Sequence, residues 1–89
     1  MKTTAENLHL PSFVAHHATN IFNDNKNLIH PSRLKEFGLA SMYLVCRINN
    51  IPIPTIKFAR IGNVANKKIV KMYKLLLKTG KYKVTPIDT

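Results

Sequence analysis

The sequence predicts an all-α helical bundle, and three observations carry this prediction. Apolar residues recur at helical spacing in several segments, proline and glycine stand between these segments, and one segment is apolar on almost every side. The chain has 89 residues and is 45% apolar, which suits one small domain of marginal stability. We expect a flexible N-terminus over residues 1–10, a folded unit over 11–80 and a C-terminal tail over 81–89.

The first expected helix covers residues 10–24, LPSFVAHHATNIFND. Pro11 suits a first helical turn. Four apolar residues at i, i+4, i+7 and i+8 form one face: Val14, Ala18, Ile21 and Phe22. The asparagine-rich run NDNKN favours a turn and is expected to end this helix.

The second expected helix lies within residues 30–50, HPSRLKEFGLASMYLVCRINN. Ser32, with Glu36 nearby, is predicted to mark its start. The segment from Phe37 to Val45 is apolar on nearly every side, which predicts a central, buried helix. Cys46 is expected to be a small core residue. As the one cysteine, it can form neither an internal disulfide nor a CxxC zinc site, and a reducing compartment is expected.

Two further helices follow a break at Pro52 and Pro54. The first is short, over residues 55–61, with either Thr55 as its N-cap or Pro54 in its first turn. The next two residues, Gly62 and Asn63, are predicted to turn the chain, since both tolerate a positive φ.

The last expected helix covers residues 66–79 and closes at Gly80, just beyond its end. A short helix, a turn and a long helix also match the outline of a helix-turn-helix. Ala59 is the small residue expected where these two helices cross.

The charge of the chain is strongly positive and uneven. Fourteen Lys and Arg stand against four Asp and Glu, a net charge of +10, and residues 51–89 hold most of the excess. On a helical wheel four lysines of the last helix share one face, which we call the lysine stripe: Lys67, Lys71, Lys74 and Lys78. On the same wheel the apolar residues cover roughly 80° to 300° and are expected to dock: Ile69, Val70, Met72, Tyr73, Leu75, Leu76 and Leu77.

Lysines three and four residues apart repel one another, so the stripe costs stability. This favours a polyanionic partner, either nucleic acid or an acidic protein surface. The alternative is one solvated face of an ordinary helix bundle.

The segment YLVCRINNIPIPTIKFARIGNVANKKIVKMYKLLLKTGKYKVTPID resembles the first cyclin-like repeat of the transcription factor B family, the archaeal and eukaryotic general transcription factor IIB. The elements of the family pattern fall in order and without a gap, and the segment LPSFVAHHATNIF resembles the preceding helix. The resemblance covers about residues 8–88, with the archaeal version nearer. The matching positions are Tyr43, Cys46, Arg47, Ile51, Pro52, Lys67, Ile69, Lys71, Tyr73, Lys74, Leu76, Leu77, Lys78, Lys83, Val84 and Pro86.

This resemblance implies a cyclin-like bundle with four of the family's five helices, ending in a helix-turn-helix-like pair. The first helix, the zinc ribbon, the reader region and the second repeat have no counterpart. Pro31-Ser32 stands where the family usually carries Gly-Arg near DNA. Ala65 replaces a capping serine, and Lys57 and Lys68 replace glutamates.

The resemblance also implies a function, that of a transcription initiation factor-like protein. Lys67 and Lys71 occupy positions that face the acidic stirrup of TATA-binding protein in the family. Further cations are expected to contact promoter DNA: Arg33, Arg47, Lys68, Lys74 and Lys78. RNA polymerase is an indirect partner, and the location is the cytoplasmic nucleoid if the chain is archaeal and the nucleus if it is eukaryotic.

The missing first helix is expected to leave part of the central helix uncovered, with Leu and Met side chains exposed. Three states of the chain are consistent with such an uncovered surface. They are a weakly folded monomer, a chain that self-associates through this surface and a half-domain that a partner completes. The alternative functions are a stand-alone helix-turn-helix regulator, which would need base-reading Arg, Asn or Gln on its last helix, and a degenerate fragment without function.

An enzyme is not expected. The four acids form no paired-carboxylate pattern, and the chain has no glycine-rich phosphate loop and no nucleophile motif. His16 and His17 point about 100° apart on a helix, and His9 and His30 lack a partner pattern, so no metal or cofactor is expected. A membrane partner is not expected, since the longest apolar run is shorter than the roughly 20 residues that span a bilayer and the proline and glycine punctuation favours a folded bundle over a membrane-surface peptide.

Overall fold

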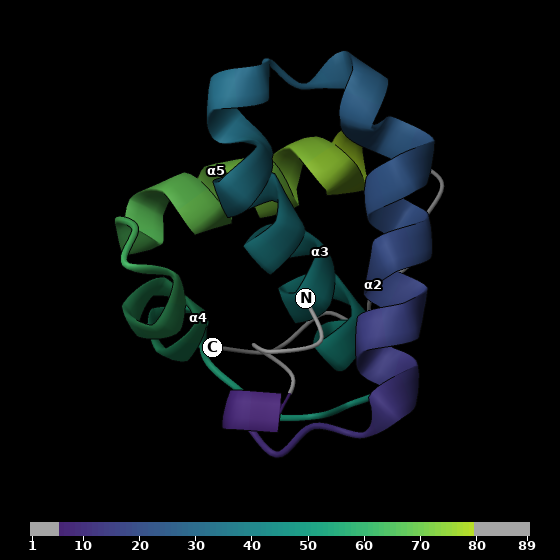
Figure 1. The fold of residues 1–89 in the computed structure, drawn as a ribbon, viewed down its shortest axis with the longest axis vertical. Helices are drawn as coiled ribbons and strands as arrows, with labels where there is room; N and C mark the ends of the chain where they lie inside the picture. Colours follow the sequence, from purple (N-terminus) through teal and green to yellow (C-terminus); the bar gives the residue numbers. More distant parts are fainter. Residues whose placement is uncertain (1–5, 80–89) are drawn as a thin grey trace.

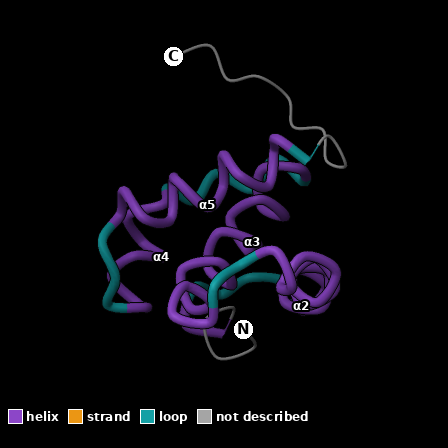
Figure 2. Tube along the Cα trace, turned by 90° about the horizontal axis from the view of Figure 1, so that it is seen from above, coloured by secondary structure: helices purple, strands orange, loops and turns teal. Residues whose placement is uncertain are grey.

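The computed structural model describes residues 6–79, and within them the chain is helical with no strand. The elements are α2 (Ser12–Asn25), η1 (Lys26–Leu28), η2 (Pro31–Arg33), α3 (Leu34–Ile48), α4 (Thr55–Gly62) and α5 (Asn66–Lys78). Helix α3 is central, with α2 and α4 on opposite sides of it (Figure 1). Figure 2 shows α5 lying across α3 as a further layer. No helix within residues 6–79 is long and apolar enough to cross a bilayer.

Helix α2 docks through the predicted face. Val14, Ala18 and Ile21 are buried. Phe22 is half-buried, and its ring centroid lies 5.6 Å from that of Phe37. The helix ends at Asn25, within the asparagine-rich run, and η1 follows at once.

The burial predicted for the central helix is confirmed. Helix α3 begins later than the sequence indicates, however, because η2 occupies residues 31–33. His30 Nδ1 accepts the Ser32 backbone N–H at 3.2 Å, and the Ser32 hydroxyl lies 2.7 Å from the same nitrogen. Ser32 therefore interacts with His30 before α3 begins and does not cap it, and no other side chain caps α3. The buried residues of α3 are Phe37, Gly38, Leu39, Ala40, Ser41, Met42, Leu44, Val45 and Cys46.

The expectation that Leu and Met of the central helix would be exposed is wrong. Leu39 is 6% exposed, and Met42 is fully buried. The reason is that α2 and α4 flank α3 closely enough to cover these side chains. From the segment expected to be flexible, Leu8 and Leu10 also pack against the core.

Gly62 and Asn63 were both predicted to form the turn between α4 and α5 by adopting a positive φ, and this prediction is correct for Asn63 only. Asn63 adopts the left-handed conformation, with φ 55°. Gly62 is instead the last residue of α4, and a Cβ there would collide with the Leu39 side chain. Gly62 thus lets α4 pack closely on α3 with the Leu39 side chain in its present position, and Asn63 supplies the positive φ of the turn.

Neither alternative that the sequence left for the start of α4 is correct. Pro54 is the N-cap residue, in extended conformation, so it does not lie in the first turn, and Thr55 is the first helical residue and not the cap. Ala59 is buried, as expected of a small residue at a helix crossing. Gly80, expected to close α5, lies outside the described residues.

Candidate functional site

Helix α5 carries the lysine stripe, and its opposite face fixes the stripe's orientation. Ile69, Met72 and Leu76 are buried against the core. The prediction that Leu75 would dock with them is wrong, because its side chain is 40% exposed. Leu75 lies about 80° from Lys67 on the wheel, at the edge of the apolar arc nearest the lysines. The covered arc is therefore narrower than the sequence suggests.

All four stripe lysines are exposed: Lys67, Lys71, Lys74 and Lys78. At 1.5 Å per residue they extend over about 16 Å along the outer side of α5. The adjacent Lys68 is exposed as well. The stripe is thus a continuous, solvent-facing row of positive charge.

The chain segment that carries the stripe supplies no acid to neutralise it. Residues 51–79, which include α4 and α5, contain seven Lys and Arg and no Asp or Glu. On α4, Lys57 and Arg60 are exposed and lie three residues apart, so they share a helix face. These two cations were not among the predicted contacts, although their spacing in an acid-free segment was a signal for them.

The first turn of α5 concentrates this positive charge. Ala65 is the N-cap and makes no side-chain hydrogen bond, and the first turn holds no acidic residue. Lys67 and Lys68 stand there instead, at the positive end of the helix dipole. The positive end of the helix dipole and two ammonium groups therefore create a positive potential at one place on the surface, which suits an anionic partner.

Arg47, a predicted DNA contact, is partly buried within the fold and contacts a neighbouring helix. It is half-buried in the last turn of α3, beside Tyr73 of α5. Burial raises the pKa of Tyr73, and the hydrogen bond that the Arg47 guanidinium donates to the hydroxyl opposes this rise. The ring of Tyr43 packs edge-on at 4.8 Å from that of Tyr73. Arg47 thus joins α3 to α5.

The two predicted arginine contacts are far apart. Arg33 is exposed at the start of α3, and Arg47 is in its last turn. At 1.5 Å per residue, the helix separates them by about 20 Å. The structure gathers the five lysines of α5 on one helix but does not gather these arginines beside each other, and the role of each in binding DNA stays a prediction.

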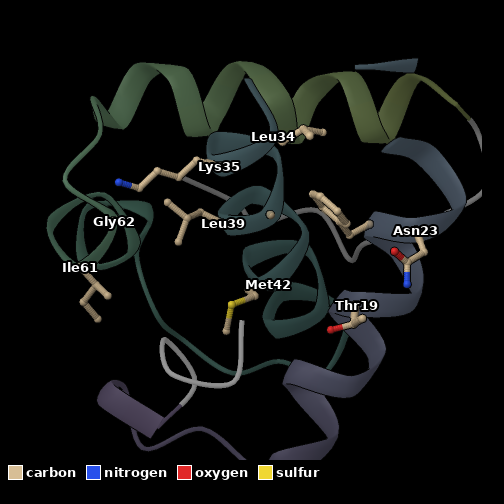
Figure 3. A pocket seen from close by; sticks show the side chains of 10 residues that line it. Thr19, Asn23, Leu34, Lys35, Leu39, Met42, Ile61 and Gly62 are labelled. Atoms are coloured by element: carbon tan, nitrogen blue, oxygen red, sulfur yellow. The ribbon is translucent and has the colours of Figure 1, made fainter. Parts of the chain in front are cut away.

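A groove of about 540 Å³ lies between α2, α3 and α4. Figure 3 shows Leu39 between α3 and Gly62, and Lys35 extending from α3 toward α4. The lining is mainly apolar and comprises Thr19, Phe22, Asn23, Leu34, Lys35, Gly38, Leu39, Met42, Ile61 and Gly62. Within residues 6–79, no group of three or more His, Cys, Asp or Glu is placed to hold a metal ion.

Comparison with known proteins gives one match. The family model described as transcription factor TFIIB repeat matches residues 1–79. No curated protein and no solved structure matches significantly.

Proposed function

The chain belongs to the family of TFIIB repeats, whose fold is a cyclin-like helical bundle, and on this premise we propose that it binds TATA-binding protein on promoter DNA. Family membership implies partners in the transcription machinery in general. The particular partners and the role of an initiation factor-like protein are our proposal. Its place would be the nucleoid of an archaeal cell or the nucleus of a eukaryotic one.

The observation that supports this proposal best is the exposed lysine stripe in a segment, residues 51–79, that contains no acid. Lys67 and Lys71 would contact an acidic protein surface next to the first turn of α5. Lys68, Lys74 and Lys78 would contact phosphates, with Arg33 and Arg47 as outlying contacts. Lysine is a flexible point charge, so these contacts would position the chain without reading bases.

The helix-turn-helix-like pair supports a second candidate, a stand-alone DNA-binding regulator. The order α4, left-handed turn at Asn63 and α5 matches that outline. The exposed face of α5 offers lysines, however, and Asn66 is the one Asn, Gln or Arg on the helix. Base reading relies mostly on those three residue types, so this second candidate would bind DNA with little sequence preference.

A gel shift tests the proposal. TATA-box DNA carrying TATA-binding protein would be titrated with the chain at about 50 mM and about 200 mM salt. The Lys67→Glu/Lys71→Glu variant would be compared with Lys26→Glu/Lys35→Glu, which changes the net charge equally at two exposed lysines outside α4 and α5. We expect a salt-sensitive supershift that the first variant loses and the second keeps.

Other outcomes would contradict the proposal. A shift of bare DNA that ignores TATA-binding protein would favour the stand-alone regulator. Equal loss in both variants would show that only net charge matters. A chain shown to be folded by circular dichroism that gives no shift at the lower salt would rule out both candidates and leave the degenerate fragment.

A further inference from the structure

The groove between α2, α3 and α4 has the size and the lining of a site for a small ligand. Its volume of about 540 Å³ lies within the roughly 300–1,000 Å³ that is usual for such sites. Half-buried apolar side chains from each of the three helices line it, among them Phe22, Leu34 and Ile61. No residue of α5 lines the groove, so it is separate from the lysine stripe.

The groove carries a single charge. Lys35 is the one charged residue among those that line it, and no Asp or Glu does. Lys35 is exposed and extends from α3 toward α4 along the edge of the groove (Figure 3). A neutral apolar ligand would desolvate this ammonium group without pairing it, and a dianion would remain half-compensated in an apolar site. A ligand with one negative charge and an apolar body is therefore the complementary occupant.

The position of Lys35 indicates how such a ligand would lie. Lys35 is near the start of α3, and Met42, which also lines the groove, is seven residues further along the same helix. At 1.5 Å per residue, the groove floor between them is about 10 Å long. An extended hydrocarbon chain of about eight carbons has this length, since its carbon–carbon bonds are about 1.5 Å long.

The burial of the groove floor argues against a protein partner. Leu39 is 6% exposed and Met42 is fully buried, although both line the groove. A second chain laid over the groove would thus gain little apolar contact from its floor, whereas a stable interface buries about 800 Å² on each partner. A narrow ligand that enters the groove contacts its walls and its floor together.

We propose that this groove binds a medium-chain monocarboxylate, with its carboxylate at Lys35 and its hydrocarbon chain along α3 toward Met42. Binding of such a ligand goes beyond the proposed function and does not depend on it, because no predicted contact to TATA-binding protein or DNA lines the groove.

An NMR titration of the ¹⁵N-labelled chain with octanoate tests the inference. We expect shifts of backbone amides on the two walls, at Phe22 and Ile61, and at Leu34 on α3, with the α5 amides unmoved. Butyrate has the same carboxylate and a chain shorter by four methylenes, and it should bind at least about tenfold more weakly. 1-Octanol has the same chain without the charge.

Two pairs of variants locate the ligand. Lys35→Met should weaken octanoate binding about two- to fivefold and leave 1-octanol binding unchanged, whereas Lys74→Met, an equal change in net charge on α5, should alter neither. Thr19→Trp places an indole ring on the exposed α2 wall and should abolish octanoate binding. His17→Trp, also exposed but about 160° away around α2, should keep it. Circular dichroism checks that each variant is folded.

Other outcomes would overturn the inference. Equal affinities for octanoate and butyrate would mean that the net positive charge attracts any carboxylate. Octanoate binding that survives in Thr19→Trp would place the ligand outside the groove. A folded chain that shifts with anionic lipid vesicles but not with free octanoate would make a membrane surface the partner. Concentration-dependent sedimentation that Thr19→Trp abolishes would make a second copy the occupant.

Discussion

Replacing Lys67 by glutamate should stabilise the fold while it weakens partner binding. Lys67 is the second residue of α5, after an N-cap, Ala65, that makes no side-chain hydrogen bond. A carboxylate there would face the positive end of the helix dipole, and it would precede Lys71 by four residues, the favourable orientation for an ion pair. The stripe therefore places a cation where the isolated fold would prefer an anion.

The expected gain in the free energy of unfolding has two parts, because the substitution turns two unfavourable interactions into favourable ones. A charge near a helix end contributes about 0.3–1 kcal/mol, so changing a cation to an anion gains about twice that. The repulsion between Lys67 and Lys71 becomes an attraction, which adds about 0.4–1 kcal/mol. Partial screening at an exposed site reduces the sum, and we expect about 1–2 kcal/mol. For a domain of this size, that raises the Tm by roughly 4–16 °C.

Lys78→Glu is the matched control, because it makes the same change in net charge at the other end of α5. Lys78 is in the last turn, where a cation is favourable and an anion is not. This variant should lose stability, although attraction to Lys74 recovers part of the loss. Urea unfolding followed by circular dichroism, at low salt and at about 1 M salt, measures both variants.

We expect Lys67→Glu to raise the free energy of unfolding and Lys78→Glu to lower it. Both changes should become smaller at high salt. Stabilisation of both would mean that relief of the net charge of +10 dominates. Destabilisation by Lys67→Glu would refute the reasoning about the first turn. It would also mean that a loss of binding in this variant reports unfolding and not a lost contact.

Three further predictions concern the packing of the fold. Asn63→Gly should leave stability equal or slightly higher, whereas Asn63→Val should lose about 1–2 kcal/mol in the same urea assay, because φ at this residue is 55°; equal stabilities would contradict the left-handed turn. Burial raises the pKa of the Cys46 thiol to about 11 from an ordinary value of 9.0, so the unfolded state loses its proton first and stability should fall as the pH rises from 9 toward 11; a Cys46→Ala variant with an equally steep fall would assign the effect to another group. Tyr73→Phe should cost about 1–3 kcal/mol by removing an acceptor from the half-buried Arg47, and no change in the urea midpoint would show that this hydrogen bond does not join α3 to α5.

Much of this protein follows from local sequence. The apolar spacing of Val14, Ala18 and Ile21, the breaks at Pro52 and Pro54 and the alternation of lysine with apolar residues in α5 each depend on residues within one or two turns. Helical periodicity and the restricted φ of proline act at that range, so all four helices and the exposed lysine stripe were predictable.

Two features that were predicted incorrectly, the role of Gly62 and the exposure of Leu75, depend on neighbours distant along the chain. Gly62 packs closely because the side chain of Leu39, 23 positions earlier, occupies the space that a Cβ would take. Leu75 is exposed because the elements packed on α5 cover a narrower arc than its apolar residues occupy. A periodic pattern states which residues prefer burial, but the width of the covered face is set by the elements that pack there.

The candidate site divides in the same way. The sequence by itself determined that α5 presents a row of lysines without compensating acids, because charge and helical period are local properties. Only the tertiary structure decided that Arg47 lies against Tyr73, and that Leu28 and Leu75 line one apolar pocket although they are 47 positions apart in the sequence. The physical reason is that such contacts form when distant segments pack around α3 to bury a common core, and no local pattern encodes which distant side chains become neighbours.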